Sequence, residues 1–361
     1  MLGTSARQRS LKTEEIWERK HTLGQGAFGT VWLEECITGA GSAGAGRDPK
    51  AALRAVKVVR KTPDVSVSEL YRELEALAKF SHDRFVHCFV RSLGWFENDT
   101  DLFIAMEYLR YGDLQNYLGQ PFPEVEARQI ALQVTEGLQL MHENGFAHRD
   151  LKPGNILVFR KGPSWWVKIG DFGISKRTGG STALRTMAIG TLGYMAPEIL
   201  GIYCPEEAES LDDGESIYTS AVDIWALGQL THKMLTNEAV FDGTRQLIIY
   251  VTRGKEFPVR DLEHISASSQ STDFIHQAMA ASPRKRLTAA AALKHPWLAG
   301  HEFMDETGSG SSEEGFVYQD LGSFCGGLLT TPATHSFTKK IETQQTRWHL
   351  DGGRRYLGQE L

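Results

Sequence analysis

The spacing of the apolar residues changes near residue 110, and this change constrains the fold more than any other feature of the chain. Residues 17–108 contain short runs rich in β-branched and aromatic residues, which is typical of strands, and one segment with helical spacing. Residues 113–298 contain mostly segments with helical spacing. The sequence therefore predicts a small lobe built on strands and a larger helical lobe, and a cleft between two such lobes commonly binds a ligand.

The helix expected in the small lobe lies at residues 66–82. Ser66 and Glu69 have the spacing of a capping box, and leucines at positions 70, 74 and 77 then repeat at helical spacing. The preceding Gly/Ala-rich residues 38–50 separate two predicted strands, so we expect a flexible hairpin loop there.

The large lobe is expected to contain a long amphipathic helix at residues 126–145, a second apolar helix at 219–235 and a short closing helix at 287–298. Residues 156–173 indicate two short strands around a Lys-Gly-Pro-Ser turn. The first of these helices has four apolar residues on one face and ends at a glycine, which is a helix stop signal. These residues are Ile130, Val134, Leu138, Met141 and Gly145.

The composition excludes several classes of protein. The chain has 361 residues, of which 41% are hydrophobic, and its net charge of −6 gives no reason to expect nucleic acid as a partner. Four scattered cysteines without a CxxC pair predict reduced thiols and a cytoplasmic or nuclear location. We expect no signal peptide, because residues 1–20 lack an apolar core, and no membrane span, because no run of about 18 apolar residues occurs.

The composition also divides the chain into segments. Residues 1–16 form a polar N-terminal extension, and residues 17–298 contain the predicted elements of one two-lobed domain, divided into about 17–108 and 109–298. Residues 299–361 begin acidic and Gly/Ser-rich, so we expect a disordered C-terminal tail.

Residues 147–158, AHRDLKPGNILV, place an unusual set of polar groups between two apolar segments. Asp150 is a candidate base for a hydroxyl proton, and Lys152 is a candidate for neutralising charge on a transferring phosphoryl group. Asn155 offers an oxygen ligand to a hard cation such as Mg²⁺. Solvated turns rarely lie between two apolar segments, so this stretch predicts a functional site.

A second oxygen ligand for that cation comes from Asp171, which follows a predicted strand and precedes Gly173 at a flexible turn. An isolated aspartate in this setting is more often part of an Asx turn. However, Asn155 and Asp171 lie on either side of the predicted strand hairpin, so their oxygens can converge on one ion.

Residues 23–31, LGQGAFGTV, contain Gly24, Gly26 and Gly29. Glycines let backbone N–H groups approach phosphate oxygens, because no Cβ is in the way. A tight turn alone would explain the same glycines. A dinucleotide-binding fold needs a helix directly after them, whereas strand-like residues follow here, which favours a hairpin lying over a nucleotide.

Lys57 lies in the apolar strand LRAVKVVR, where alternation puts it on the same face as Ala55 and Val59. Such a lysine is either an exposed edge residue or an amine held for an anion. Glu73 borders the apolar stripe of the helix at 66–82 and needs a partner there. Lys57 and Glu73 can therefore pair, and the pair can hold the amine towards phosphates.

Together these segments resemble a eukaryotic protein kinase of the serine/threonine type. Six motifs occur in the family's order, namely GQGAFGTV, AVK, RELEAL, HRDLKPGN, DFG and APE, and they cover roughly residues 17–298. The resemblance implies an α+β, bilobal fold, in which the small lobe has an antiparallel five-stranded sheet and one helix. The larger lobe would be mostly helical.

The resemblance also implies a reaction, which is transfer of the γ-phosphoryl group of MgATP to serine or threonine hydroxyls of protein substrates. Asp150 and Lys152 would be the catalytic residues, and Asn155 and Asp171 the Mg²⁺ ligands. The ATP contacts would come from the glycine hairpin, the strand lysine with its glutamate, and the linker between the lobes. These residues are Leu23, Gly24, Gln25, Gly26, Ala27, Phe28, Gly29, Val31, Ala55, Lys57, Glu73, Met106, Glu107, Leu109 and Leu157.

Specificity and regulation follow from the same resemblance. Lys152, and Thr191 of GTLGYMAPE, are typical of serine/threonine kinases, and Arg149 is typical of kinases that use a phosphate in the activation segment. Ser181, Thr182 and Thr186 are the candidates for that phosphate. We favour Thr186, modified by an upstream kinase or by a second copy of the chain. The general character is similar to calcium/calmodulin-dependent and checkpoint kinases.

Three further residues are expected to be structural. Asp223 lies three residues after Ser220, which predicts a capping-box acid at a helix start, and the resemblance adds a hydrogen bond to the HRD backbone. Glu198 of APE would pair with Arg286 in a buried bridge.

Two other functions compete with an active protein kinase. A pseudokinase scaffold often lacks the strand lysine or one of the two motif aspartates, whereas this chain keeps Lys57, Asp150 and Asp171. A small-molecule kinase of the same fold is disfavoured, because GTLGYMAPE is similar to the segment that binds peptide substrates.

Overall fold

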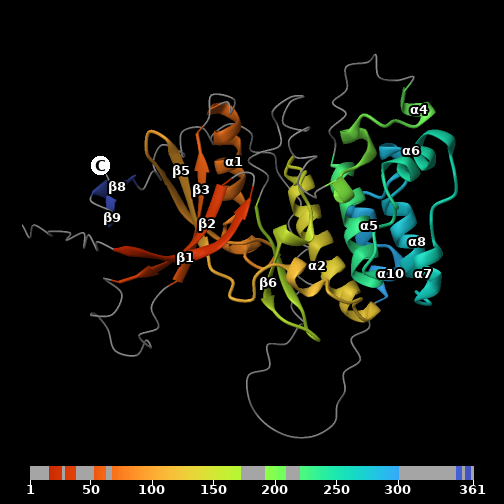
Figure 1. Cartoon of the computed structure of the whole chain (residues 1–361), viewed down its shortest axis with the longest axis horizontal. Coiled ribbons are helices and arrows are strands. Elements are labelled where there is room, and N and C mark those ends of the chain that lie inside the picture. Colours follow the sequence, from red (N-terminus) through yellow and green to blue (C-terminus); the bar gives the residue numbers. More distant parts are fainter. Residues whose placement is uncertain are drawn as a thin grey trace, which may run out of the picture.

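The two-lobed arrangement is seen directly in the computed structural model, with the sheet and α1 on one side and the helical lobe on the other (Figure 1). The structure describes residues 16–26, 29–37, 53–61, 67–171, 192–208, 220–300, 347–351 and 354–358. The predicted loop at 38–50 and the activation segment with Ser181, Thr182, Thr186 and Thr191 lie outside the described residues.

The small lobe contains the antiparallel five-stranded sheet that the resemblance implied. Its strand order is β1-β2-β3-β5-β4. The helix α1 follows β3 and begins at Val67, directly after Ser66, although the capping contact itself lies outside the described residues. The elements are β1 (Trp17–Gly26), β2 (Gly29–Cys36), β3 (Leu53–Arg60), α1 (Val67–Phe80), β4 (Ser92–Glu97) and β5 (Asp101–Glu107).

The two faces of this sheet carry separate apolar clusters, as the alternation in β3 predicted. Val59 of β3 belongs to the same cluster as Leu77 of α1 and Ile104 of β5, and this cluster continues into the large lobe. Val56 packs in a second cluster, made from β3, β4 and β5 alone. Lys57 faces the first side and is 7% exposed, so it is a buried amine and not an edge residue.

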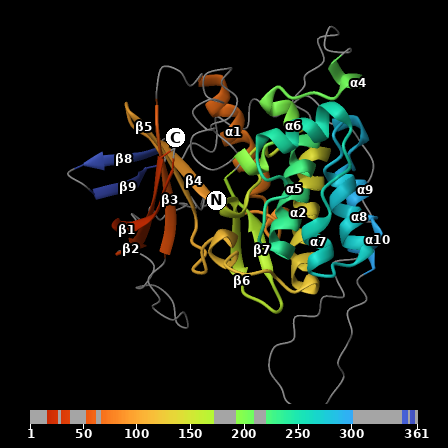
Figure 2. The same cartoon turned by 45° about the vertical axis from the view of Figure 1, so that its right-hand side comes forward.

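The large lobe is mostly helical, as predicted, and Figure 2 shows α2, α5 and α8 side by side within it. Its helices and strands are α2 (Glu124–Glu143), β6 (Ile156–Arg160), β7 (Trp166–Ile169), α4 (Pro205–Ala208), α5 (Ala221–Thr236), α6 (Thr244–Arg253), α7 (Arg260–His264), α8 (Ser269–Ala278), α9 (Ala289–Leu293) and α10 (Pro296–Ala299). Short 3₁₀ turns connect several of them, including η2 (Leu114–Tyr117) and η3 (Pro153–Asn155).

The long helix α2 forms for the reason the sequence indicated. Ile130, Val134 and Leu138 are all 0% exposed, and burial of each such side chain contributes about 1.5–3 kcal/mol. The helix ends before Gly145, whose φ of +78° is the left-handed conformation that glycine adopts without steric cost.

The helix α5 is buried around almost its whole circumference, which is the signature of a central helix. It packs against α2 and α8. Trp225 of α5 is 1% exposed, and its ring lies under the Arg286 guanidinium, 4.9 Å from the ring centroid. This helix therefore forms the fixed centre of the large lobe.

The closing segment differs from the expectation of one helix at 287–298. Two short helices occur there, α9 and α10, and Pro296 begins the second one. Proline lacks the N–H that a continuing helix would need, and it favours an extended conformation for the residue before it, so the chain breaks at His295 and restarts.

A strand hairpin is described in the C-terminal region, and the disordered tail expected at 299–361 stays a prediction. The strands β8 (Arg347–Asp351) and β9 (Arg354–Gly358) pair antiparallel. The hairpin lies against β1 and β4 of the small lobe, and both views place it beside the sheet (Figures 1 and 2).

The predicted bridge between Glu198 and Arg286 is present and is fully buried. Two parallel contacts join the groups, at 2.5 Å from Nη1 to Oε1 and at 2.8 Å from Nη2 to Oε2. Arg286 Nε also donates to the Ala280 carbonyl at 2.8 Å, so the guanidinium satisfies several acceptors in the turn before α9. Among the described helices, none is long and apolar enough to cross a membrane.

Replacing Arg286 by leucine should destabilise the large lobe strongly, because the Glu198 carboxylate would remain buried without its cation. We expect a loss of about 3–5 kcal/mol of unfolding free energy, measured by urea denaturation followed by tryptophan fluorescence. The neighbouring Lys285 provides the matched control, since its pair with Glu206 is exposed on both sides. Lys285→Leu should cost at most about 1 kcal/mol, and equal losses for the two variants would contradict the assignment.

Candidate functional site

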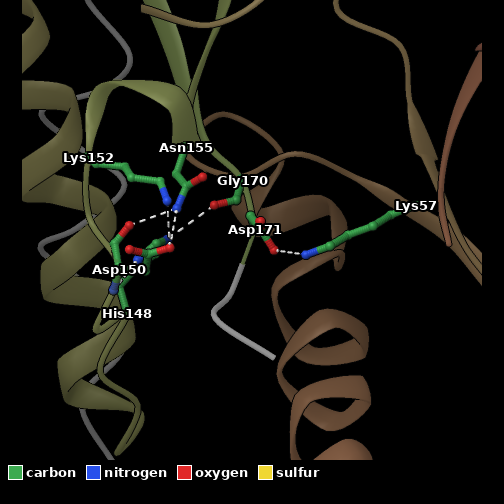
Figure 3. A network of polar contacts seen from close by, with 7 residues as sticks. All are labelled: Lys57, His148, Asp150, Lys152, Asn155, Gly170 and Asp171. Atoms are coloured by element: carbon green, nitrogen blue, oxygen red, sulfur yellow. Dashed lines mark hydrogen bonds and ion pairs between the residues drawn. The ribbon is translucent and has the colours of Figure 1, made fainter. Parts of the chain in front are cut away.

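Asp150 lies in the loop between α2 and β6 and is held by the two polar residues that follow it. Lys152 Nζ donates to Asp150 Oδ2 at 3.0 Å, and Asn155 Nδ2 donates to the same oxygen at 3.2 Å and to the Asp150 carbonyl at 2.7 Å. The Asp150 side chain is 4% exposed. The structure therefore brings together the aspartate, lysine and asparagine that the sequence singled out (Figure 3).

The loop that carries Asp150 is held by hydrogen bonds to the side chain of Asp223 in α5. Oδ2 of Asp223 accepts the His148 N–H at 2.8 Å, and Oδ1 accepts the Arg149 N–H at 2.7 Å. His142 Nε2 lies 2.9 Å from Oδ2. The carboxylate is 0% exposed, so these contacts form away from water.

The capping-box role predicted for Asp223 is wrong, and the hydrogen bond implied by the resemblance is present. The Asp223 N–H bonds to the backbone carbonyl of Ser220, and the Ser220 side chain makes no capping bond. Both carboxylate oxygens bond to groups near Asp150 instead. A buried carboxylate loses its hydration, and two backbone N–H donors compensate for this loss better than the single donor of a capping box would.

His148 connects the Asp150 loop to the strand before Asp171. Its Nε2 lies 3.1 Å from the Gly170 carbonyl, and its Nδ1 accepts the Asp150 N–H at 3.3 Å. A carbonyl can only accept, so Nε2 carries the proton and the ring is the neutral Nε2–H tautomer. The ring therefore sets the distance between the two aspartate segments.

Two residues of the site have left-handed backbone conformations. Arg149 has φ of +63° and Asp171 has φ of +54°. For residues other than glycine this conformation costs on the order of 1–3 kcal/mol, and it persists only where surrounding contacts enforce it. The Arg149 N–H bond to Asp223 is such a contact.

Lys57 of the small lobe reaches Asp171 of the large lobe. Lys57 Nζ donates to Asp171 Oδ1, and Figure 3 shows the two side chains pointing towards each other. Burial alone would raise the pKa of Asp171, but the nearby Lys57 ammonium holds it below its usual value, with a smaller contribution from Lys152. The carboxylate therefore stays ionised at neutral pH.

The proposed pairing of Lys57 with Glu73 stays a prediction, because the Glu73 side chain lies outside what the structure describes. Glu73 itself belongs to α1. Ala27 and Phe28 at the tip of the glycine hairpin also lie outside the described residues.

The oxygen chemistry of Asn155 and Asp171 fits a hard cation such as Mg²⁺. The amide nitrogen of Asn155 is used by Asp150, and its Oδ1 accepts no hydrogen bond within the described part of the chain. Asp171 is ionised and 36% exposed. A carboxylate and an amide oxygen, with phosphate oxygens and water completing the shell, is a donor set that Mg²⁺ accepts. Figure 3 shows the Asp171 side chain directed towards Lys57 and not towards Asn155. The two residues expected to bind the cation therefore do not contact each other in this structure.

Many of the residues expected to contact ATP lie in two rows across the small-lobe sheet, two residues apart along β3 and therefore on the same face. Strand pairing places Gly24 opposite Val31 and Val31 opposite Lys57. The second row places Ala55 opposite Met106. Leu23, Gln25 and Gly26 belong to β1 beside the first row, and Leu157 of β6 comes from the large lobe.

Glycine has a clear physical reason at position 29. Gly29 has φ of +136°, and a Cβ there would lie 1.8 Å from the Val58 carbonyl oxygen. Gly24 differs, because a Cβ there would meet nothing within 4 Å. Packing therefore explains Gly29, whereas the open space beside Gly24 fits the expectation that a ligand approaches there.

The linker between the lobes is anchored by Glu107, whose role sequence reasoning had limited to its backbone. Glu107 Oε1 accepts from Lys168 Nζ at 2.6 Å and from the Arg91 N–H at 2.8 Å. The Lys168 side chain is 3% exposed. The N–H of Leu109, two residues after Glu107, makes no hydrogen bond within the described residues. It is therefore available to donate to the adenine of ATP, as expected.

Lys168 and His142 were missed by the sequence analysis. Lys168 lies in the apolar strand WVKI, so the reasoning applied to Lys57 would have found it. His142 follows the buried Met141 on the last turn of α2, and no local pattern separates it from an ordinary helix residue.

Comparison with known proteins gives one consistent family. The protein kinase domain family matches residues 17–298. The chain is 34% identical over 288 residues to serine/threonine-protein kinase RAD53 of Saccharomyces cerevisiae, covering 76% of this chain and 32% of that protein. It is 31% identical over 293 residues to serine/threonine-protein kinase cds1 of Schizosaccharomyces pombe, covering 78% and 58%. The chain thus spans less than two thirds of either yeast protein.

Two further similarities agree with these. Calcium/calmodulin-dependent protein kinase type 1 of Caenorhabditis briggsae is 31% identical over 293 residues, which is 80% of this chain and 74% of that protein. The crystal structure of Rad53 1–466 in complex with AMP-PNP aligns with a TM-score of 0.59 and 31% identity, covering 78% of this chain and 65% of that one.

Replacing Asp223 by asparagine should loosen the Asp150 loop. An asparagine side chain has one acceptor, so one of the two backbone N–H groups would lose its bond at a cost of about 1–3 kcal/mol. Amide hydrogen exchange at His148 and Arg149 should then accelerate by roughly tenfold or more. Asp273, whose side chain is 54% exposed and contacts the buried His295, is the matched control. Unchanged exchange in Asp223→Asn, or an equal change in Asp273→Asn, would rule out the anchoring role.

Replacing Gly29 by alanine should destabilise the small lobe, because its Cβ would collide with the Val58 backbone and its φ would be strained. Gly24→Ala should leave stability nearly unchanged, since the space there is open. Thermal unfolding without nucleotide would compare the two, with a drop of several degrees expected for Gly29→Ala alone. Equal melting temperatures would show that the hairpin adjusts freely.

Proposed function

The chain belongs to the protein kinase family, and from that premise we propose that it is an active serine/threonine protein kinase. The observation that carries the proposal is the polar chain joining the two lobes. Asp150 is held by Lys152 and Asn155, His148 ties this loop to Gly170, and the next residue, Asp171, contacts Lys57. An inactive scaffold would have no need to keep these groups in mutual contact.

In the proposed reaction a substrate hydroxyl attacks the γ-phosphorus of ATP. The new O–P bond forms as the bond between the γ-phosphorus and the β–γ bridging oxygen breaks, and ADP leaves. Asp150 orients the hydroxyl and receives its proton, and Lys152, 3.0 Å from the Asp150 carboxylate, stabilises charge on the transferring group. Mg²⁺, when bound with ATP, neutralises phosphate oxygens, and Asn155 and Asp171 are the residues that would hold it.

The small lobe would bind the rest of ATP. Lys57 would contact the α and β phosphates, and the glycine hairpin would cover them. Ala55 and Leu157 would enclose the adenine beside Met106, and the backbone of Glu107 and Leu109 would hydrogen-bond it. The strand pairing supports this arrangement, because it brings residues expected to contact the phosphates and the base to one face of the sheet.

Serine and threonine are the proposed acceptors in protein substrates. Lys152 supports this specificity from its place beside Asp150. The names of the yeast relatives, both described as serine/threonine-protein kinases, support it as well. Activation by phosphate at Thr186, added by an upstream kinase or by a second copy, and a cytoplasmic or nuclear location belong to the same proposal.

Replacing Asp150 by asparagine tests the activity. The native protein should transfer labelled phosphate from MgATP to serine or threonine in a degenerate Ser/Thr/Tyr peptide library. Asp150→Asn should lower kcat by about 10²–10⁴-fold, because it removes the proton acceptor and leaves ATP contacts in place. Asp83→Asn is the control, since the Asp83 side chain is 89% exposed and lies outside the site.

The outcomes separate the competing functions. Label on tyrosine alone would contradict the serine/threonine assignment. Equal activity of native protein and Asp150→Asn would remove Asp150 from the mechanism. No transfer by native protein after incubation with an activating kinase, with ATP binding intact, would favour the scaffold.

A further inference from the structure

The strand β1 carries residues 23–26 of the glycine hairpin, and its backbone pairing is irregular. It lies at the edge of the small-lobe sheet and pairs with β2. The ladder between the two strands has one register shift between Arg19 and Thr22 and another between Thr22 and Gly24. Such irregularities interrupt the ladder and let a strand bend. Backbone pairing alone therefore defines the position of residues 23–26 loosely.

Side chains of β1 compensate by reaching over β2 to the strands beyond it. They lie on the face of the sheet turned away from α1, which we call the outer face. The Arg54 guanidinium of β3 lies over the Trp17 ring, 4.0 Å from its centroid. The Arg19 guanidinium lies 5.1 Å from the ring centroid of Trp32 and 6.0 Å from that of Phe103 in β5. Guanidinium groups are attracted to ring faces, so these contacts attach β1 to β3 and β5.

Glu34 of β2 lies at the centre of this layer, and its side chain is 0% exposed. Its Oε2 accepts from Arg54 Nε at 3.1 Å and from Arg54 Nη2 at 2.8 Å. Its Oε1 lies 3.6 Å from Arg19 Nε. Strand pairing explains this geometry, because Arg19 and Arg54 are the residues directly opposite Glu34 in the two neighbouring strands. One carboxylate therefore joins three strands.

The layer lies directly behind residues that are expected to bind ATP. Successive residues of a strand point to opposite faces of the sheet. Ala55 follows Arg54 in the sequence, and Val31 precedes Trp32. Val31 is also paired with Lys57. A displacement of β1 or β2 on the outer face would therefore change the distance between the glycine hairpin and Lys57.

We propose that Arg19 and Glu34 are positioning residues for ATP binding, and that the ion pair between them holds the glycine hairpin at its working distance from Lys57. This inference rests on the proposed function, since it concerns the ATP site of the same reaction. A hairpin that is already held in place loses less conformational freedom when ATP binds, which increases affinity. The Arg19 side chain is 38% exposed and that of Arg54 is 3% exposed. Arg19 can therefore be replaced without opening the buried pair of Glu34 and Arg54.

Arg19→Met tests the proposal, because methionine keeps an unbranched apolar side chain and removes the charge. We expect the Kd of the full chain for MgATP, measured by calorimetry, to rise about tenfold, since the freed hairpin must be ordered on binding. At saturating MgATP, kcat should change by less than about twofold, as when an interaction contributes equally to the ground state and the transition state.

Lys20→Met is the matched control. Lys20 is the next residue of the same strand, and its Nζ lies 2.6 Å from Glu35 Oε2, again in β2. The control thus removes a lysine that joins the same two strands outside the layer around Glu34. Its Kd for MgATP should stay within about twofold of the native value. An equal rise of Kd in Arg19→Met and Lys20→Met would overturn the proposal.

A cycle of double variants tests whether Arg19 acts through Glu34. Glu34→Gln removes the charge with little change of shape, and urea denaturation establishes the temperature at which each variant is folded. If the pair carries the effect, Arg19→Met/Glu34→Gln should weaken MgATP binding no more than the stronger single variant does. Single effects that multiply in the double variant would overturn the proposal, because the two residues would then act independently.

Hydrogen exchange without nucleotide gives a readout that needs neither ATP nor activity. In Arg19→Met, the amides of residues 17–26 should exchange about tenfold faster than in native protein, because β1 is loosened locally. Amides of the buried helix α5 should keep their native rate. Equal acceleration in β1 and α5 would indicate a general loss of stability and would overturn the positioning role.

The measurements also separate this inference from the proposed function. Native protein that binds MgATP but transfers no phosphate would contradict the proposed activity, and the change of Kd would still decide the role of Arg19. Native protein that transfers phosphate, with unchanged MgATP affinity in Arg19→Met, would overturn the positioning role alone.

Discussion

The buried carboxylate of Asp223 is the contact on which the rest of the site depends. It lies on α5, which is buried almost all round and is fixed by packing against α2 and α8. Its two oxygens bind the His148 and Arg149 N–H groups, so the loop takes its position from the most rigid element of the lobe. A carboxylate at 0% exposure is stable only with such donors. The bond from the Arg149 N–H offsets the cost of the left-handed φ of Arg149, which directs the chain into Asp150.

The position of Asp150 is passed on to the small lobe by directional polar contacts. His148 bonds to the Gly170 carbonyl, and Asp171 meets Lys57 directly after it. A second link runs from Lys168 of β7 to Glu107 at the end of β5. Apolar packing also joins the lobes, but it is non-directional and does not define how the functional groups are oriented. Each of these hydrogen bonds fixes the distance between two named atoms. Proximity and orientation are what phosphoryl transfer requires of the protein.

Local patterns predicted what depends on local physics. Apolar periodicity gave the buried face of α2, and alternation gave the two faces of β3, because both depend only on neighbouring residues. Asp223 shows where this reasoning stops. Its spacing from Ser220 fits a helix cap, yet its partners lie 74 and 75 residues away, and only the packed lobe decides between the two.

The partner of Lys57 shows how charge and backbone geometry act together. Burial would favour protonation of Asp171, and the Lys57 ammonium reverses that preference. A carboxyl whose folded-state pKa is lowered contributes stability above its unfolded pKa of about 3.9, and loses that contribution only as the pH falls through the lower folded value. Near neutral pH the Asp171 carboxylate therefore stays ionised. The left-handed φ of Asp171 lies at the residue whose side chain contacts Lys57 of the other lobe. The Asp171 carboxylate, which contacts the Lys57 ammonium here and is proposed to bind Mg²⁺ with ATP, is thus held ionised where the two lobes meet. A carboxyl group must be ionised to bind a metal ion.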